Sequence, residues 1–578
     1  MAEVYHPFPS RTRKLSPPAP MVLLSRESRS LPGFFISFLK IFLKIFPKIE
    51  AKSHFFLLTH RRHIMFVLNY CHGGYDGDIV SVEADLRNGI PGIDIVGMAD
   101  VAVKESAERV RIAVKNSGLE FPKSRVAVNL APAGVRKEGA YFDLSIAIAI
   151  LSQYGTVAPA DYRIMVLGEL ELSGRIRAVK GTLSAVIAGQ KAGADYFIVP
   201  EENYLEACSA LADNIFPCSS LIEAVKALNA LAESGRISVP APRLVPGMAE
   251  EDMYGDMADI QGQEYLKQAL LTAASGRHNI MLFGPPGSGK TMAAQRLVTL
   301  LPDLDYDKSV ETTRIHSIAG ILHSGCGLVG RPPLRMPHHT ASLEGIIGGG
   351  KYLKPGEISL AHNGILFLDE APEFHKNVLQ SLREPVERHR VDLARAGQNY
   401  WYPADFQLVL TTNPCPCGNR GKPDSVCVCS NSEVSTYWKR LGGALLDRID
   451  IRIPVRPLSA EDMIYSDKPV PTSAELRAQV EKAHDIQKKR FTGTDICYNS
   501  QIPPGRISKY IQMDEAAQNI FSKAVRRFSL STRACHSVLK IARTIADMSG
   551  YTGMQLKKEH ILDAVQMRRY GDSDFFWN

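Results

Sequence analysis

Residues 284–291 read Gly284-Pro285-Pro286-Gly287-Ser288-Gly289-Lys290-Thr291, which matches the pattern G-x-x-x-x-G-K-[ST] at every position. An apolar run at residues 279–283 precedes this stretch, and a helical pattern at residues 292–301 follows it. Glycines let backbone N–H groups close around phosphate oxygens, and the N-terminus of the following helix adds positive partial charge. The sequence therefore predicts a phosphate-binding loop, with Lys290 on the β- and γ-phosphates of ATP and the Thr291 hydroxyl on Mg²⁺.

Two carboxylates follow a second apolar run, about eighty residues further along the chain. Residues 365–368 are all apolar, which is typical of a parallel strand that is buried on both faces. Asp369 and Glu370 come directly after it, at the strand end where parallel sheets bind ligands. We expect Asp369 to bind Mg²⁺ and Glu370 to polarise the water that attacks ATP, so the chain is predicted to be an ATPase.

Three further side chains are candidates for contacts at the γ-phosphate. Asn413 follows a strand expected at residues 406–412 and would orient the attacking water, although a turn-forming residue before Pro414 explains it equally well. Arginine is suited to stabilising phosphate charge, and we expect Arg448 to do so from a neighbouring subunit and Arg533 within its own chain. The alternative is that each arginine simply pairs with a surface carboxylate.

Hydrophobic patterning divides the chain into six parts. Strand-like runs (79–85 and 126–130) and helical runs (143–153 and 182–192) alternate in the first of two α/β domains. Pro-rich, aperiodic stretches mark a linker and a bridge. Apolar residues at three- and four-residue spacing mark a helical lid, with helices expected at 516–528, 532–548 and 558–569. The expected parts are a leader (1–64), a first α/β domain (65–235), a linker (236–253), a second α/β domain (254–455), a bridge (456–497) and a C-terminal lid (498–578).

The positive charge of the chain is concentrated in the leader. Residues 1–64 hold eleven Lys and Arg against three Asp and Glu, whereas the remaining residues hold 57 against 58. The overall charge therefore does not predict nucleic-acid binding by the folded part. An apolar run at residues 34–46 is short and contains Lys40 and Lys44, so we expect no membrane span. We expect the leader to be disordered or an over-extended gene start, with folding beginning at Met65.

The ten cysteines favour thiols or a metal site over a disulfide framework, because no secretory signal is recognised. A cytoplasmic location is therefore expected. Four cysteines form two C-x-C pairs, Cys415 with Cys417 and Cys427 with Cys429. Four thiolates are the number that a tetrahedral Zn²⁺ site requires. The C-x-C spacing is tighter than the usual ligand spacing, so ordinary free thiols remain the alternative.

Motifs across residues 65–570 resemble those of the YifB/ComM family of magnesium-chelatase-like ATPases. The front domain contributes Ile-Val-Gly (95–97), Val-Lys-Glu-Ser (103–106) and Asn-Leu-Ala-Pro (129–132), and the lid contributes Leu-Ser-Thr-Arg (530–533) and Ala-Arg-Thr-Ile-Ala-Asp (542–547). The second domain contributes the phosphate loop, Pro-His-His (337–339), Gly-Gly-Gly (348–350), Pro-Gly-Glu-Ile-Ser-Leu-Ala-His-Asn-Gly (355–364), Asn-Pro-Cys-Pro-Cys-Gly (413–418) and Leu-Asp-Arg-Ile-Asp (446–450).

The resemblance implies a Lon-protease-like (ribosomal S5 domain 2-like) N-terminal domain, a P-loop AAA+ α/β domain of the helix-2-insert clade and an α-helical lid. It implies a homo-hexameric ring with ATP at subunit interfaces. Asn413 would then be sensor 1, Arg448 the arginine finger with Arg440 as its rival, and Arg533 sensor 2. The implied function is an ATP-driven motor on single-stranded or branched DNA, with branch migration or helicase activity in recombination or natural transformation. The alternative is a magnesium-chelatase-like or protein-remodelling ATPase that does not act on DNA.

The front domain departs from the Lon pattern at the positions of the catalytic dyad. The stretch Lys137-Glu138-Gly139-Ala140 corresponds to the run before the Lon nucleophile and is followed by Tyr141. Leu183 stands where Lon has its catalytic lysine. A Ser-Lys dyad needs both side chains, so the sequence predicts a scaffold and not an active protease.

By the same resemblance, two hairpins would contact DNA in the pore of the ring. One would lie near residues 388–398 and offer Arg388, Arg390 and Arg395 to phosphates, and the other would include Lys351. A solvated turn held by salt bridges is an equal alternative.

Overall fold

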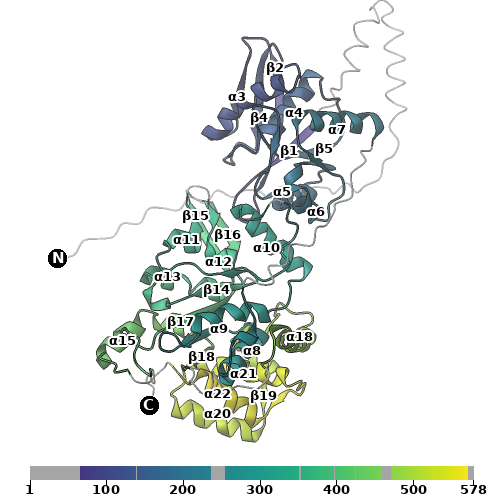
Figure 1. Cartoon of the computed structure of the whole chain (residues 1–578). Coiled ribbons are helices and arrows are strands. Elements are labelled where there is room, and N and C mark those ends of the chain that lie inside the picture. The colour runs from purple at the N-terminus through teal and green to yellow at the C-terminus, as the bar shows by residue number, and fades with distance from the viewer. Residues whose placement is uncertain are drawn as a thin grey trace, which may run out of the picture. The chain divides into compact units, whose positions relative to one another are not determined.

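The computed structural model describes most of the chain from Met65 to Tyr570, and these residues fall in one compact unit (Figure 1). The described ranges are 65–137, 139–235, 254–323, 325–350, 353–395, 398–422, 425–457 and 470–570. The expected leader and linker, residues 458–469 of the bridge, Lys351 and the side chain of Arg395 lie outside them.

A seven-stranded mixed sheet organises the first α/β domain. Its strand order is β3-β4-β2-β1-β5-β8-β9, and β1 pairs antiparallel with β2 but parallel with β5. The strands are β1 (Phe66–Cys71), β2 (Asp78–Arg87), β3 (Gly92–Val96), β4 (Arg125–Ala131), β5 (Arg163–Val166), β8 (Tyr196–Pro200) and β9 (Ile215–Cys218), beside a small hairpin of β6 (Glu169–Leu170) and β7 (Ile176–Arg177). The helices are α3 (Val101–Asn116), α4 (Asp143–Tyr154), α5 (Thr182–Lys191), α6 (Tyr204–Cys208) and α7 (Leu221–Ser234).

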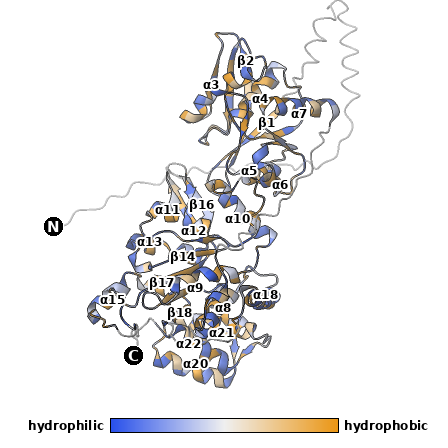
Figure 2. Cartoon of the chain, viewed as in Figure 1, coloured by the Kyte–Doolittle hydropathy of each residue, from blue (hydrophilic) through white to orange (hydrophobic). Residues whose placement is uncertain are grey.

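Helix α4 is the centre of this domain because it is apolar on nearly every side. Every residue from Asp143 to Leu151 is buried, and the surrounding strands are largely orange in Figure 2. The buried Asp143 carboxylate accepts hydrogen bonds from Arg109 of α3 at 2.9 and 3.0 Å. Burial of a charge without a partner is costly, so this pair fixes α3 against α4.

A five-stranded parallel sheet forms the second α/β domain. Its order is β11-β14-β17-β10-β18, and all four strand pairs are parallel. The three central strands are buried over their whole length, as expected for a sheet covered on both faces. The strands are β10 (Ile280–Phe283), β11 (Leu334–Arg335), β14 (Ile365–Leu368), β17 (Gln407–Thr412) and β18 (Ile451–Pro454). The helices are α8 (Glu264–Gly276), α9 (Lys290–Arg296), α10 (Tyr306–Ala319), α11 (Leu343–Ile347), α12 (Glu357–Leu360), α13 (Lys376–Ser381), α14 (Pro385–Arg388), α15 (Asn431–Lys439) and α16 (Gly443–Leu446).

Two antiparallel hairpins project from this domain at the places where pore hairpins were expected. One pairs β12 (Gly348–Gly349) with β13 (Lys354–Pro355), and the other pairs β15 (Arg390–Arg395) with β16 (Gln398–Pro403).

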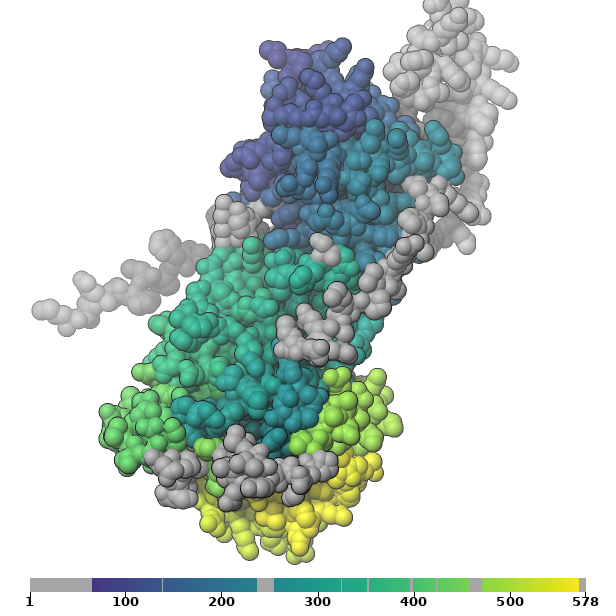
Figure 3. Space-filling model, in the orientation of Figure 1, coloured from purple at the N-terminus to yellow at the C-terminus, as the bar shows by residue number. Residues whose placement is uncertain are grey.

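The C-terminal residues form a helical lid that shares a hydrophobic core with the second domain. Leu476 and Val538 of the lid pack in the same cluster as Ile280 and Ile451 of the sheet. The lid contains α18 (Ser473–Arg490), α19 (Ile507–Tyr510), α20 (Glu515–Arg527), α21 (Thr532–Met548) and α22 (Lys558–Arg568), with a two-stranded sheet of β19 (Gln512–Met513) and β20 (Gln555–Leu556). Figure 3 shows the yellow-green lid surface adjoining the teal surface of the second domain. Because α18 belongs to this core, half of the expected bridge is a part of the lid. No helix in the described ranges has both the length and the apolar character needed to cross a membrane.

Helix α10 and strand β16 contact the first domain: the Tyr75 N–H donates to the Trp401 carbonyl oxygen of β16 at 3.0 Å, and α10 adds buried polar contacts. The Ser317 hydroxyl donates to the buried Glu206 carboxylate at 2.5 Å and accepts from the Gly181 N–H at 2.7 Å. The Arg314 guanidinium lies 3.8 Å from the centre of the Tyr75 ring and donates to the Ser184 hydroxyl at 3.2 Å. Burial raises the pKa of Glu206, although the hydrogen bond from Ser317 opposes that shift.

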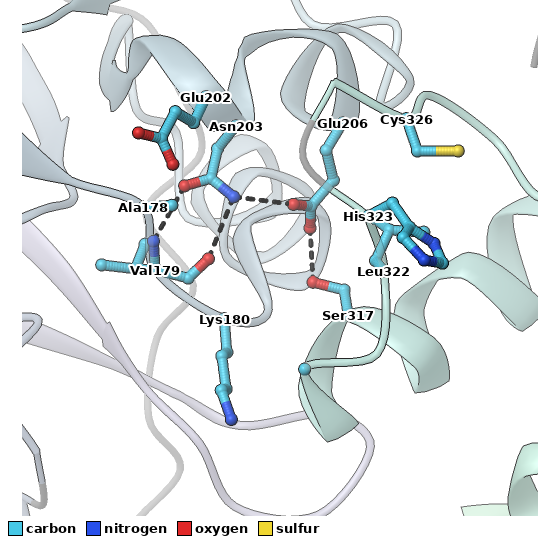
Figure 4. A pocket seen from close by; sticks show the side chains of 11 residues that line it. Ala178, Val179, Lys180, Glu202, Asn203, Glu206, Ser317, Leu322, His323 and Cys326 are labelled. Carbon is cyan, nitrogen blue, oxygen red and sulfur yellow. Dashed lines mark hydrogen bonds between the residues drawn. The ribbon is translucent and has the colours of Figure 1, made fainter.

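A small polar pocket of about 180 Å³ lies beside this contact (Figure 4). Lys180, Glu202 and Glu206 line it from the first domain, and His323 and Cys326 line it from the segment after α10. The side chains of Asn203 and Glu206 are already hydrogen-bonded to each other and to their neighbours there. The pocket therefore belongs to the packing of α10 against the first domain.

Candidate nucleotide-binding site

The predicted phosphate loop connects β10 to α9, as the sequence pattern requires. Gly287 and Gly289 have φ angles of +79° and +85°, which glycine adopts without strain. At Gly284 a side chain is excluded for another reason, because a Cβ atom would lie 2.1 Å from the Val455 carbonyl oxygen. The loop can therefore keep its backbone close to β18 only with glycine at this position.

Lys290 lies inside the loop and connects it to the neighbouring strand. Its ammonium donates to the carbonyl oxygens of Gly284 at 2.7 Å and Pro285 at 2.9 Å, and to the amide oxygen of Asn413 at 3.3 Å. Burial lowers the pKa of Lys290, and the nearby Asp369 and Glu370 carboxylates oppose that shift. The geometry brings a cation and the predicted sensor Asn413 to the same point at the carboxyl end of the sheet.

Thr291 and Asp369 form the predicted pair of Mg²⁺ ligands. The Thr291 hydroxyl lies 3.0 Å from Asp369 Oδ2, and Asp369 also accepts a short hydrogen bond from the Thr411 hydroxyl. A hydroxyl and a carboxylate are hard oxygen ligands of the kind that Mg²⁺ prefers. The residues present therefore fit the ion that an ATP site needs.

Glu370 stands next to this pair with a different environment. It is exposed and has a left-handed backbone, with φ of +49°, which is uncommon for a residue other than glycine. Its N–H donates to the Thr411 hydroxyl at 3.0 Å. This turn leaves the carboxylate open to solvent, where it can contact water beside the phosphates.

Thr411 is the functional residue that the sequence analysis missed. Its hydroxyl serves Asp369 and the backbone of Glu370 together, so it positions both carboxylates. The available signal was the threonine pair that closes the strand before Asn413.

The predicted arginine finger and sensor 2 lie together, at a carboxylate that the sequence analysis did not single out. Arg448 makes a short hydrogen bond to Glu387, and Arg533 donates to the other oxygen of the same carboxylate at 3.2 Å. These ion pairs lower the pKa of Glu387. Both arginines therefore lie at one carboxylate within the same chain.

The rival finger and the hairpin arginines also pair with acidic neighbours. Arg440 lies 3.6 Å from Glu373, Arg388 lies 2.6 Å from Glu384, and Arg390 contacts Asp392. All three arginines keep about half or more of their side-chain surface exposed. The hairpin is thus a salt-bridged turn whose cations remain accessible.

The four clustered cysteines come together in space. Their sulfur atoms all lie within 4.8 Å of one another, and no disulfide joins them. This arrangement could hold one metal ion, separate from the Mg²⁺ ligands.

Most of the chain is similar to one group of known sequences. Residues 256–463 match the family described as magnesium chelatase, subunit ChlI. Residues 82–203 match the family of subunit ChlI of Mg-chelatase, and residues 471–568 match the ChlI C-terminal family.

Several curated proteins match over most of their length. An uncharacterised Mycobacterium tuberculosis protein is 37% identical over 501 residues, which cover 86% of this chain and 97% of the relative. Competence protein ComM of Haemophilus influenzae is 36% identical over 506 residues, covering 86% of this chain and 95% of ComM. YifB of Escherichia coli, also uncharacterised, is 36% identical over 500 residues, which cover 86% of this chain and 95% of YifB.

Proposed function

Because this chain belongs to the magnesium-chelatase-like AAA+ family that includes ComM and YifB, we propose that it hydrolyses ATP as a ring motor that remodels DNA. The observation that carries ATP hydrolysis is the meeting of Lys290, Thr291, Asp369 and Asn413 at the carboxyl ends of β10, β14 and β17. Ligands bind at this edge in open parallel sheets.

Each of these residues has a distinct task in hydrolysis. The loop N–H groups and Lys290 bind the phosphates, and Thr291 and Asp369 hold Mg²⁺. When bound, Mg²⁺ neutralises charge on the β- and γ-phosphate oxygens. Glu370 accepts a hydrogen bond from the attacking water, and Asn413 orients that water from the next strand.

The proposed assembly is a homo-hexameric ring with ATP between subunits. Arg448 and Arg533 would reach the γ-phosphate bound by the neighbouring subunit, leaving Glu387 as they do so. An arginine supplied in trans stabilises the charge of the transition state.

DNA is the proposed substrate on two grounds. ComM is described as a competence protein, which fits a role with incoming DNA. Arg390 of the β15–β16 hairpin and Arg388, the last residue of α14, are also exposed cations, and cations of this kind bind phosphates independently of sequence. We propose branch migration or helicase activity on single-stranded or branched DNA.

The decisive measurement is the ATPase rate of the full chain without DNA and with single-stranded, duplex or branched DNA. We expect branched or single-stranded DNA to raise kcat, with less stimulation at higher salt because phosphate contacts release counterions. Lys290→Ala is the control for contaminating ATPase. An ATPase rate that none of the three DNAs changes would instead support the second candidate, a chelatase-like or protein-remodelling ATPase. The match to magnesium chelatase subunits favours this candidate.

For the separate cluster of four cysteines we propose Zn²⁺ as the bound metal, because four thiolates are a usual structural zinc site.

A further inference from the structure

The four-cysteine cluster has the dimensions of a tetrahedral metal site. Cys415 Sγ lies 3.4 Å from Cys417 Sγ and 3.6 Å from Cys427 Sγ. Cys417 Sγ and Cys427 Sγ are 3.7 Å apart. Zinc–sulfur bonds of about 2.3 Å place the sulfurs of a regular tetrahedron about 3.8 Å apart. A disulfide would need about 2.05 Å. The sulfurs are therefore spaced for a shared metal ion and not for a covalent bond.

Burial of apolar surface explains the order of the second cysteine pair only in part, because Cys427 and Cys429 pack against the core of the second domain but the valines beside them do not. Val426 and Val428 alternate with Cys427 and Cys429 and are 82% and 83% exposed. A segment that exposes its apolar side chains gains little from the hydrophobic effect, and needs another source of free energy to offset its lost entropy. A metal that cross-links both pairs supplies it.

The first cysteine pair lies against the phosphate loop. Gly418 directly follows Cys417 and has a φ of +76°. A Cβ atom at Gly418 would lie 2.9 Å from Cγ of Pro286, the third residue of the loop. The backbone after the cysteine pair therefore touches the part of the chain that binds phosphate.

The same pair follows the predicted sensor. Asn413 stands two residues before Cys415 and accepts a hydrogen bond from Lys290. The intervening Pro414 carbonyl accepts from the Trp438 indole N–H at 3.1 Å, and the Trp438 ring lies edge-on to Phe283 at the end of β10. Pro414 is thus fixed to the strand that leads into the loop.

The second pair leads into helix α15. Ser430 follows Cys429 and caps this helix, donating to and accepting from Glu433. Trp438, which fixes Pro414, belongs to the same helix. A metal bound by both pairs would close the loop between Asn413 and α15, the helix whose Trp438 holds Pro414.

We infer that the four cysteines form a zinc site that holds Asn413 and the segment around Gly418 against the phosphate loop, so that ATP turnover depends on zinc although no thiolate contacts the nucleotide. The inference rests on the proposed ATPase function. The zinc content of the protein can be measured independently of ATPase activity, so the zinc proposal and the ATPase proposal can be refuted separately.

The first test compares the full chain with a Cys415→Ser, Cys427→Ser double variant, using Cys497→Ser as the control because Cys497 is an exposed lid cysteine. We expect about one zinc per chain in the wild type and in Cys497→Ser by elemental analysis, and almost none in the double variant. We expect kcat of the double variant to fall about tenfold or more, as for the loss of groups that only orient a functional side chain. A wild type without zinc, or a metal-free variant with full kcat, would overturn the inference.

The second test probes the contact and needs no loss of cysteine. Gly418→Ala and Gly118→Ala place alanine at nearly the same backbone angle, with φ of +76° and +73°, but Gly118 has no neighbouring atom within 4 Å of its added Cβ. We expect Gly418→Ala to keep its zinc and to lose ATPase activity, and Gly118→Ala to keep both. Equal kcat values for the two variants would contradict the proposed coupling. Bound zinc in a wild type without ATPase activity would refute the proposed function instead.

Discussion

Lys290 and Glu370 sit in opposite environments, and their replacement should separate binding from hydrolysis. Lys290 is buried among loop carbonyls, whereas Glu370 is exposed beside the Mg²⁺ ligands. We predict that Lys290→Ala abolishes ATP binding, because it removes the cation on the phosphates. Glu370→Gln should keep the wild-type affinity but stop turnover, because it removes only the group that polarises water. Binding of a fluorescent ATP analogue, measured beside phosphate release, would check this, and unchanged affinity in Lys290→Ala would contradict the assignment.

Thr411 offers a second residue-level test. Thr411→Val keeps the shape of the side chain but removes the hydrogen bond from the Glu370 N–H, and a hydrogen bond of this kind contributes about 0.5–1.5 kcal/mol. We predict a loss of stability of about that size and a severalfold higher Mg²⁺ requirement for hydrolysis, since Asp369 also loses a donor. Chemical denaturation and Mg²⁺ titration would measure the two effects. Thr411→Ser, which keeps the hydroxyl, should stay close to wild type in both.

The sequence predicted the functional residues that belong to a short motif, but not those whose partners are distant in the chain. Lys290, Thr291 and Asp369 stand in recognisable patterns, and the structure brings them together. Glu387 has no such pattern, since its two arginine partners are 61 and 146 residues away in the chain. Ion pairs of this kind depend on tertiary packing, which a periodic pattern does not encode.

At the scale of single elements, amphipathic helices were predicted closely. The expected helices at 516–528, 532–548 and 558–569 correspond to α20, α21 and α22 within one residue at each end. The helix expected at 292–301 differs, because α9 begins at Lys290 and gives way to a 3₁₀ turn (Leu297–Leu300). Strand order in the two sheets arises from pairing between distant segments, so it does not follow from local periodicity.

The β15–β16 hairpin should be sensitive to pH at its base. The His389 imidazole lies 3.0 Å from Asp405, and the backbone of His389 also accepts from the Ala404 N–H. The hydrogen bond to Asp405 raises the pKa of His389. A raised pKa in the folded state means that this ion pair stabilises the protein at pH values below the ordinary histidine pKa of about 6.5 and is lost as the pH rises through the folded value.

We therefore predict that the stability difference between wild type and His389→Gln is largest at mildly acidic pH and shrinks as the pH rises above neutrality. Denaturant unfolding of both proteins from about pH 6 to pH 9 would measure it. A difference that stays constant over this range would show that the histidine acts only through its backbone.

At the scale of the whole assembly, Arg448 and Arg533 both contact the Glu387 carboxylate, and from this we predict how they act across a subunit boundary. Arg448→Ala and Glu370→Gln should each be inactive alone but should complement when mixed, because some interfaces then pair an intact Glu370 with an intact Arg448. Random mixing in equal amounts leaves about a quarter of the interfaces intact in a cyclic ring. Arg533→Ala should complement Glu370→Gln in the same way, since the two arginines lie together.

The readout is ATPase activity of mixed rings whose composition is confirmed by native mass spectrometry. Recovery with Arg448→Ala but none with Arg533→Ala would show that the arginines serve different nucleotides. Failure of both pairs, with mixed rings present, would mean that Arg448 acts in cis or that Arg440 is the finger.

The contact of α10 with the first domain connects that domain to the nucleotide-binding site. Only five residues separate α10 from the 3₁₀ turn that follows the phosphate-loop helix. Arg314 and Ser317 of α10 are held against the first domain by buried polar contacts. Such contacts lose their free energy when stretched by little more than an ångström, so they do not slide. In the proposed ring motor, a displacement of α10 during turnover would therefore move the first domain with it.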